Sequence, residues 1–368
     1  MNHTAPGALR RRFIAAGSLA AAAALAFTGC ASGGSGSGSG SDANGDEPIG
    51  VSLIVKTTTN PFFVAMQDGA EAAADELGVE LTMAAGKEDG DEDTQIQAIE
   101  NAISKGDAGI LITPNGPAVE DALVKARDAG LYVIALDTPP ADPESVDITF
   151  ATDNFQAGQE IGKWAAAKLD GEKATIALID LFDDKVVSVD YNRDQGFLDG
   201  MGIDTADAEA NGDEEATGTY SGGDYEIVGN EASQGAEDGG RTAAETLLSK
   251  NPDINVVYTI NEPAAYGAYE AFKAAGPTDD LIVVSVDGGC AGIDAVKEGI
   301  IGATSQQYPV KMAELGVQAI FDLVETGEVP ENSAGLDFFN TGVALVTDDP
   351  QDGVESIDTA EGGEICWG

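Results

Sequence analysis

Side chains that can hydrogen-bond to hydroxyl groups occur where the predicted strands of this sequence end. The polar members of this set are Asn60, Asp137, Asp180, Asn261, Asp287 and Gln307. Arg193 lies in a helix-forming segment near one of these strand ends, and Phe62 and Phe63 closely follow Asn60. Any single Asp or Asn carries little weight, because both are common in turns for local reasons. The whole set, with its two aromatic residues, indicates one polar pocket with an apolar wall.

The chemistry of this set favours a neutral ligand with several hydroxyl groups. Planar amides and carboxylates form paired hydrogen bonds with adjacent hydroxyls, and an aromatic face covers the C–H face of a sugar ring. A single arginine among several carboxylates disfavours a phosphate or another strongly anionic ligand. The alternative for Phe62 or Phe63 is that one of them is a plain core residue.

The stretch 49–63 shows how one such side chain is positioned. A run of β-branched and aliphatic residues predicts a buried strand, and Asn60-Pro61 ends it where a first helical turn accepts proline. Apolar residues at helical spacing then predict a helix over 62–77, with Gly78 as its stop. In open α/β sheets, ligands bind at the carboxyl ends of the strands.

Strand and helix patterns alternate along the rest of the chain. The predicted strands are 79–84, 108–113, 131–136, 148–151, 175–180, 226–228, 255–260, 281–286, 302–305 and 343–346. The predicted helices are 94–105, 118–129, 155–169, 187–200, 239–250, 264–275, 291–298 and 310–326. Repeated βαβ units imply an α/β fold with parallel sheets covered by helices on both faces. The segment 202–224 reads as a solvated loop, whose carboxylates lack the spacing of a calcium-binding EF-hand.

Composition narrows the possible partners. The chain of 368 residues is long enough for two domains, and its 65 acidic against 18 basic residues repel nucleic acid and anionic lipid. The single histidine, His3, lies in the leader. This weighs against a Ser-His-Asp hydrolase or a His-ligated metal enzyme, and neither a metal nor a cofactor is expected.

Residues 1–30 are predicted to be a targeting segment. Three arginines precede a short apolar run over 13–27, which ends in Thr28-Gly29-Cys30. This ending resembles the lipobox of bacterial lipoproteins, in which Cys30 would carry the lipid and become the first mature residue. The alternative is an ordinary secretory leader with an incidental cysteine. Residues 31–48, rich in Gly and Ser and then acidic, read as a flexible tether.

The strand-end motifs resemble a known family. They are Thr59-Asn60-Pro61-Phe62-Phe63, Val133-Ile134-Ala135-Leu136-Asp137, Thr259-Ile260-Asn261-Glu262 and Val284-Ser285-Val286-Asp287-Gly288. With them, residues 49–368 are similar to the periplasmic substrate-binding proteins of sugar ABC transporters, in the ribose-binding (type I) group. The resemblance implies that Asn60, Phe62, Phe63 and Asp137 face the sugar from one lobe. It places Arg193, Asn261 and Asp287 on the other lobe, and Gln307 at a hinge.

Two departures from the ribose-binding pattern point to another sugar. Thr138 stands where ribose binders have an arginine, and Gln234-Gly235 lies near their second-lobe aromatic residue. Several stretches look more like the fructose-binding branch, namely 153–155, 261–265, 287–290, 302–309 and 366–368. The resemblance therefore implies fructose, or a close ketose or furanose.

The family architecture has two Rossmann-like lobes joined by three hinge crossings, expected here near 151–154, 306–308 and 340–342. The N-terminal lobe would comprise 49–152 and 308–340, and the C-terminal lobe 153–307 and 341–368. The resemblance implies a monomer that closes on its sugar and hands it to an ABC permease from outside the cytoplasm. Alternatives are another monosaccharide such as ribose, a chemoreceptor-linked sugar sensor, the core of a sugar-responsive repressor, and a glycosidase.

Cys290 and Cys366 are the cysteines that remain once Cys30 is lipidated. They are 76 positions apart in a chain expected to be exported, where oxidation is the default. We therefore expect a disulfide between them. Two separate buried thiols are the alternative.

Overall fold

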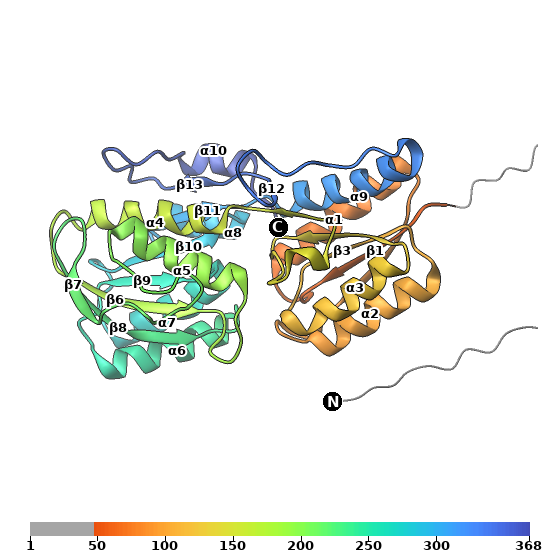
Figure 1. The fold of residues 1–368 in the computed structure, drawn as a ribbon. Coiled ribbons are helices and arrows are strands. Elements are labelled where there is room, and N and C mark those ends of the chain that lie inside the picture. Colours follow the sequence, from red (N-terminus) through yellow and green to blue (C-terminus); the bar gives the residue numbers. More distant parts are fainter. Residues whose placement is uncertain (1–47) are drawn as a thin grey trace, which may run out of the picture. The chain divides into compact units, whose positions relative to one another are not determined.

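The computed structural model describes residues 48–368 and shows two β-sheets, each with helices on both faces (Figure 1). The predicted leader with Cys30 and almost the whole predicted tether lie outside the described residues. Within the part that is described, no helix combines the length and apolar character needed to cross a membrane.

The first lobe is built on a six-stranded sheet in which all neighbouring strands run parallel. Its strand order is β12 (Phe339–Asn340), β5 (Ile148–Ala151), β4 (Tyr132–Leu136), β3 (Gly109–Ile112), β1 (Gly50–Val55) and β2 (Glu80–Ala85). Apolar residues alternate between the two faces of the central strands. One face packs against α1 (Pro61–Leu77) and α9 (Pro309–Thr326). The other packs against α2 (Glu92–Lys105) and α3 (Glu120–Asp128).

The second lobe is built on a seven-stranded sheet. Its order is β13 (Ala344–Val346), β11 (Ala303–Gln306), β10 (Ile282–Asp287), β9 (Val256–Thr259), β6 (Ala174–Asp180), β8 (Asp224–Ala232) and β7 (Thr217–Thr219). The edge strands β13 and β7 pair antiparallel with their neighbours, and the other pairs are parallel.

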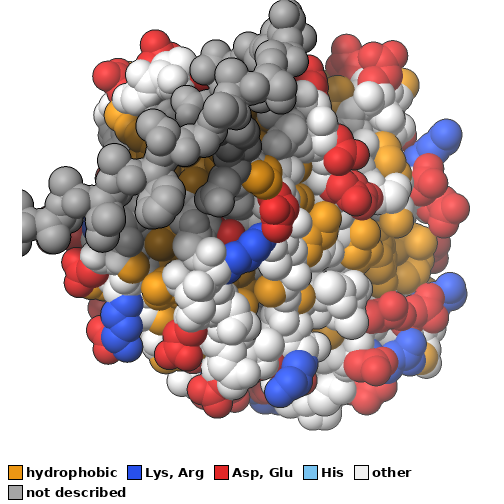
Figure 2. Space-filling view, turned by 90° about the vertical axis from the view of Figure 1, so that its right-hand side faces the viewer, with side chains coloured by type: hydrophobic (Ala, Val, Ile, Leu, Met, Phe, Trp, Pro, Cys, Tyr) orange, Lys and Arg blue, Asp and Glu red, His pale blue; other side chains and the backbone are white. Residues whose placement is uncertain are grey.

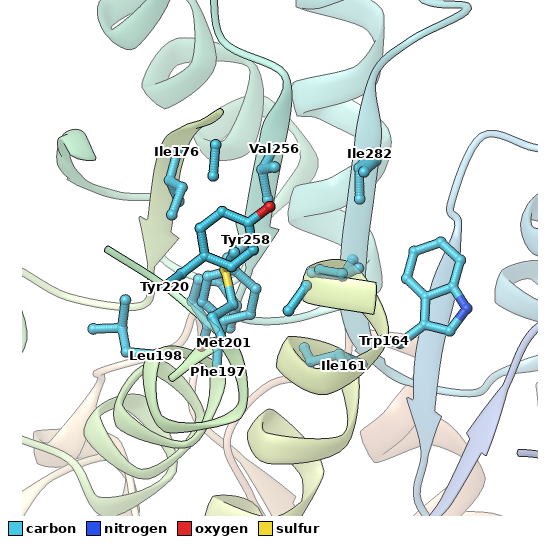
Figure 3. Close-up of a cluster of buried hydrophobic side chains, with 14 of the residues drawn as sticks. Ile161, Trp164, Ile176, Phe197, Leu198, Met201, Tyr220, Val256, Tyr258 and Ile282 are labelled. Carbon is cyan, nitrogen blue, oxygen red and sulfur yellow. The ribbon is translucent and has the colours of Figure 1, made fainter. Parts of the chain in front are cut away.

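Helices cover both faces of this second sheet. One face carries α4 (Asn154–Lys168) and α5 (Ser188–Met201). Phe197 and Met201 of α5 lie beside Tyr258 of β9, and Trp164 of α4 lies in another part of the same core (Figure 3). The opposite face carries α6 (Glu237–Lys250), α7 (Glu262–Ala275) and α8 (Cys290–Lys297). The short helix α10 (Thr359–Glu364) packs on α8.

Both sheets share one winding order. Counted along the chain within each lobe, the main parallel strands lie in the order 2-1-3-4-5, as β2-β1-β3-β4-β5 and as β8-β6-β9-β10-β11. In such doubly wound sheets, ligands bind beyond the carboxyl ends of the strands. The chain passes between the lobes at 152–153, 307–308 and 341–343, so the predicted two-lobed fold with three crossings is confirmed.

The prediction of a plain loop over 202–224 is wrong at its end, because β7 forms a hairpin with β8 there. The strands β7 and β12 are three and two residues long, so they leave little local pattern in the sequence. β7 pairs with the neighbouring β8, and β12 pairs with the distant β5. The predicted disulfide is present, and it joins Cys290 to Cys366 with their Cα atoms 4.9 Å apart. Acidic side chains outnumber basic ones across the face shown in Figure 2, in keeping with the net charge of −47.

Candidate functional site

A small cleft lies between residues of both lobes, and we call it the cavity. Concave sites with apolar walls and a few placed polar groups are typical of small-molecule binding. All the residues predicted to face the sugar line it, namely Asn60, Phe62, Phe63, Asp137, Arg193, Asn261, Asp287 and Gln307. Lys56, Asp89, Leu181, Val189 and Ile260 complete the lining. The structure thus brings together side chains that are far apart in the sequence.

The start of α1 supplies the aromatic part of the wall. The Asn60 side chain caps this helix, because its Oδ1 accepts a hydrogen bond of 2.9 Å from the backbone N–H of Phe62. The rings of Phe62 and Phe63 pack edge to face with their centroids 5.3 Å apart. Both rings are buried, line the cavity and belong to the core of the first lobe. Each of the two rings is therefore both part of the cavity wall and part of the core.

Asp137 follows β4 in a left-handed backbone conformation, with φ of 63°. Aspartate tolerates this region better than most residues, although it still costs energy. Its Oδ2 accepts a hydrogen bond of 2.8 Å from the Thr138 hydroxyl. Its Oδ1 is buried and has no hydrogen-bond partner, and Arg193 Nη2 lies 3.7 Å away. An acceptor in this state is suited to a ligand hydroxyl.

Arg193 reaches the cavity from α5 in the second lobe. Its guanidinium donates to Asn154 Oδ1 at 2.8 Å, to the Ile260 carbonyl at 3.0 Å and to Gln307 Oε1 at 3.1 Å. The backbone that carries it is held close to α4 by glycines. A Cβ on Gly158 would lie 2.1 Å from the Arg193 carbonyl oxygen, and one on Gly196 would lie 2.2 Å from that of Phe155. These contacts fix the position of the arginine before any ligand binds.

Asp287 ends β10 and faces the cavity from the second lobe. Its Oδ1 accepts a hydrogen bond of 3.2 Å from Gln307 Nε2, and its Oδ2 accepts one of 3.3 Å from the Glu262 N–H. Burial raises the pKa of Asp287, whereas the nearby Arg193 charge lowers it. Burial and the charge of Asp287 also raise the pKa of Glu262, whose carboxyl accepts from the Gly288 and Gly289 N–H groups. This part of the site is therefore a desolvated pair of carboxyl groups held by backbone donors.

Asn261 lines the cavity with much of its amide already engaged. Its Oδ1 accepts from the Ala264 N–H at 3.1 Å, which caps α7. Its Nδ2 donates to the Gly235 carbonyl at 3.0 Å. The side chain thus anchors the loop around Gly235 to the start of a helix, and one N–H and one lone pair are left for a ligand.

Sequence reasoning missed two charged residues of the cavity. Lys56 directly follows β1, so its strand-end position was the signal that could have identified it. Asp89 lies in the loop after β2, where no periodic pattern marks it. Its Oδ1 is covered from solvent without a hydrogen-bond partner, and burial raises its pKa while the charge of Lys56 lowers it.

Asp180 does not join the others, so grouping it with them was wrong. It ends β6 and accepts a hydrogen bond of 2.9 Å from Asn230 Nδ2, outside the lining of this cavity. With Asp190, Asp194 and Glu214 it forms what we call the acidic cluster. Burial, and then the charge of Asp190, raise the pKa of Asp180 well above its usual range.

The cavity offers hydrogen-bonding groups of both kinds beside two aromatic rings. Carboxylate oxygens of Asp137 and Asp89 that accept no hydrogen bond are available acceptors, and Arg193 and Lys56 supply charged donors. Among residues 48–368, no three or more His, Cys, Asp or Glu side chains are grouped so as to hold a metal ion. The arrangement suits a small ligand with several hydroxyls and one apolar face.

Comparison with known proteins agrees with this chemistry. Residues 49–328 match the family described as periplasmic binding protein domain. The ribose import binding protein of Haemophilus influenzae is 30% identical over 288 residues, which cover 78% of this chain and 89% of that protein. A solved ABC transporter solute binding protein from Agrobacterium vitis with bound D-fucose is 26% identical, with a TM-score of 0.70 over 86% of this chain and 100% of that one. A galactofuranose binding protein shares the fold at 22% identity, with a TM-score of 0.71 over 86% of this chain and 98% of that one.

Proposed function

Because this chain belongs to the periplasmic binding protein domain family, we propose that it binds fructose between its two lobes and delivers it to an ABC permease. It is the extracytoplasmic sugar-binding component of an ABC importer for a monosaccharide, and not an enzyme. The identity of the sugar, the residues that hold it and the membrane anchor are the proposed parts.

The single observation that carries the site assignment is the cavity lined from both lobes. Asp137 comes from the first lobe, Arg193 and Asp287 come from the second, and Gln307 lies in a crossing between them. A sugar that bonds to these side chains gains contacts with both lobes only when the lobes are closed. Its binding energy therefore shifts the population toward the closed form, which a permease can distinguish from the open one.

We propose that the lobes move as 49–152 with 308–340 against 153–307 with 341–368. The crossings at 152–153, 307–308 and 341–343 would bend, because they connect elements that belong to different sheets. Hinges of this kind are a few residues at the ends of elements. We expect the chain to act as a monomer, since one chain supplies both walls of the cavity.

The choice of fructose rests on the stretches that resemble the fructose-binding branch, and residues of these stretches lie in or beside the cavity. Asn154 accepts a hydrogen bond from Arg193, and Asp287 and Gln307 line the cavity. Thr138, which stands where ribose binders have an arginine, donates to Asp137. The relatives described above bind ribose, D-fucose or galactofuranose by name. Those sugars, with allose and tagatose, are therefore the competitors to test.

A thermal-shift screen of residues 48–368 against these sugars tests the ligand. A ligand at one hundred times its dissociation constant stabilises the folded chain by about 2.7 kcal/mol. Fructose should give the largest shift, and isothermal titration calorimetry should then measure its affinity. A larger shift with any of the competing sugars would refute the choice of fructose, and no shift with any monosaccharide would refute the site assignment. Fructose recovered after incubation should be unchanged.

We also propose that Cys30 anchors the chain to the membrane through a lipid. This residue lies outside the described residues, so the proposal rests on Thr28-Gly29-Cys30 and the tether that follows. A Cys30→Ser variant should appear in the medium or remain unprocessed, whereas the natural chain should stay with the membrane fraction. Cleavage elsewhere and an unmodified Cys30 in mass spectrometry would refute the anchor.

A further inference from the structure

Trp367 lies in the C-terminal tail, residues 365–368, which the disulfide fastens to the second lobe. Its side chain nevertheless packs into the first lobe, where it is buried within the apolar core. Its indole packs edge-on against the ring of Phe62, with centroids 5.3 Å apart and planes at 82°. Phe62 lines the proposed sugar cavity, so Trp367 supports the aromatic wall from behind.

The same tail is fastened to the second lobe. Cys366 is disulfide-bonded to Cys290, the first residue of α8. The Cys290 N–H donates to the Trp367 carbonyl at 2.9 Å. Gly289 leaves room for the indole, because a Cβ there would lie 3.3 Å from the Trp367 ring. Trp367 is thus held by one lobe while its ring packs into the other.

Trp367 also contacts the hinge directly. Its Nε1 donates a buried hydrogen bond of 2.9 Å to the backbone carbonyl of Gln307, which lies in the crossing 307–308. The Gln307 side chain accepts from Arg193 and donates to Asp287, at 3.1 and 3.2 Å. Trp367 therefore holds the backbone of Gln307, and the side-chain amide of Gln307 lies between Arg193 and Asp287.

We propose that Trp367 is a positioning residue of the sugar site, and that the Cys290–Cys366 disulfide holds it in place. This inference rests on the proposed function. Trp367 fixes the Gln307 backbone and the Phe62 ring before the sugar arrives, so less ordering is needed when it binds. The tail forms a further connection between the lobes beside the three covalent crossings. If Trp367 had only a structural role in the core of the first lobe, its substitution would lower stability and leave the affinity for the sugar unchanged.

The test compares two matched substitutions in the full chain. Trp367→Phe keeps a ring on Phe62 but removes the hydrogen bond to the Gln307 carbonyl. Trp164→Phe is the control, because Trp164 Nε1 donates at 2.9 Å to the Asp349 carbonyl, away from the lining of the cavity. Without this hydrogen bond the Gln307 backbone has to be ordered when the sugar binds, and the loss of a buried hydrogen bond is equivalent to at most about a tenfold change in the dissociation constant. Trp367→Phe should weaken fructose binding by about that factor, mainly through faster dissociation.

Removal of the disulfide gives a second variant that tests the same contact. Cys290→Ser with Cys366→Ser should weaken binding in the same direction. Combined with Trp367→Phe it should add little, because both changes act through one contact. The Trp164→Phe control should lower the melting temperature and leave affinity and dissociation rate unchanged. If Trp367→Phe behaves like this control and the serine variant also binds normally, the inference is wrong. If the natural chain itself binds no sugar, the proposed function fails first and this inference fails with it.

Discussion

Asp137→Asn is the sharpest perturbation of the proposed site, because it keeps the size of the side chain and removes its charge, and with it the 3.7 Å ion pair with Arg193. In the structure, Asp137 Oδ1 is buried without a hydrogen-bond partner, ready to accept from a sugar hydroxyl. A hydrogen bond to a charged group contributes about 1.5–3 kcal/mol, and each 1.4 kcal/mol is about a tenfold change in affinity. Because asparagine keeps one oxygen acceptor, we expect the lower part of that range, roughly 10- to 30-fold weaker binding. Isothermal titration calorimetry with the best sugar of the screen measures it.

Stability should change little in the same variant. Asparagine tolerates the left-handed backbone that Asp137 adopts at φ 63°, whereas alanine does not. Arg193 keeps its bonds to Asn154, Ile260 and Gln307 when the charge of Asp137 is lost. A shift of the melting temperature below about 2 °C is expected, which corresponds to roughly 1 kcal/mol for a chain of this size. Asp142→Asn makes the same charge change on an exposed side chain that caps a short helix, so it controls for long-range electrostatics.

The opposite pattern would refute this reasoning. If Asp137→Asn binds within about twofold of the natural chain, a difference of roughly 0.4 kcal/mol, the carboxylate does not hold the sugar. A clear fall in the melting temperature of the sugar-free variant would then show that Asp137 serves the turn after β4. The sugar assignment would in that case depend on the family and on the remaining cavity residues.

Three further predictions concern stability and positioning. Burial, and then the charge of Asp180, raise the pKa of Asp194 in the folded chain. The free energy of unfolding should therefore fall as pH rises from the ordinary aspartate pKa to this raised pKa. Melting curves over a pH series should show a smaller fall for Asp194→Asn. Gly158→Ala should cost about 1–3 kcal/mol in urea unfolding and weaken sugar binding, because the new Cβ displaces the backbone of Arg193. Replacing Cys290 and Cys366 by serine should lower the free energy of unfolding by up to about 4 kcal/mol, because the unfolded chain gains conformational entropy when the disulfide is lost.

The sequence was informative where local patterns decide the structure. The strands that precede Asn60 and Asp137 and the strand that ends in Asp287 are short, mainly apolar runs, and polar residues at the ends of parallel strands meet at one end of a sheet. Asp180 sits at the same kind of strand end but lies outside the cavity, because a strand end does not specify which side of the sheet a side chain faces.

Several features that sequence reasoning missed leave little pattern in the sequence. The edge strands β7 and β12 exist only through pairing. Trp367 lies in the tail assigned to the second lobe, yet its ring packs into the core of the first. The acidic cluster buries carboxyl groups that composition would place on the surface. Lys56 is also buried, but its position directly after β1 was a signal that could have identified it.

The two strained aspartates connect the fold to the proposed function. Asp137 has φ of 63° and Asp287 has φ of 153°, and non-glycine residues in such regions cost about 1–3 kcal/mol each. Glycine would relieve this strain, so the presence of a carboxylate favours a role for the side chain. Both residues lie at the end of the fourth strand of their own 2-1-3-4-5 order, β4 in one lobe and β10 in the other. Each lobe thus contributes one carboxylate from the same topological position. Arg193 and Gln307 lie between them, so a ligand that bonds to both carboxylates joins the lobes.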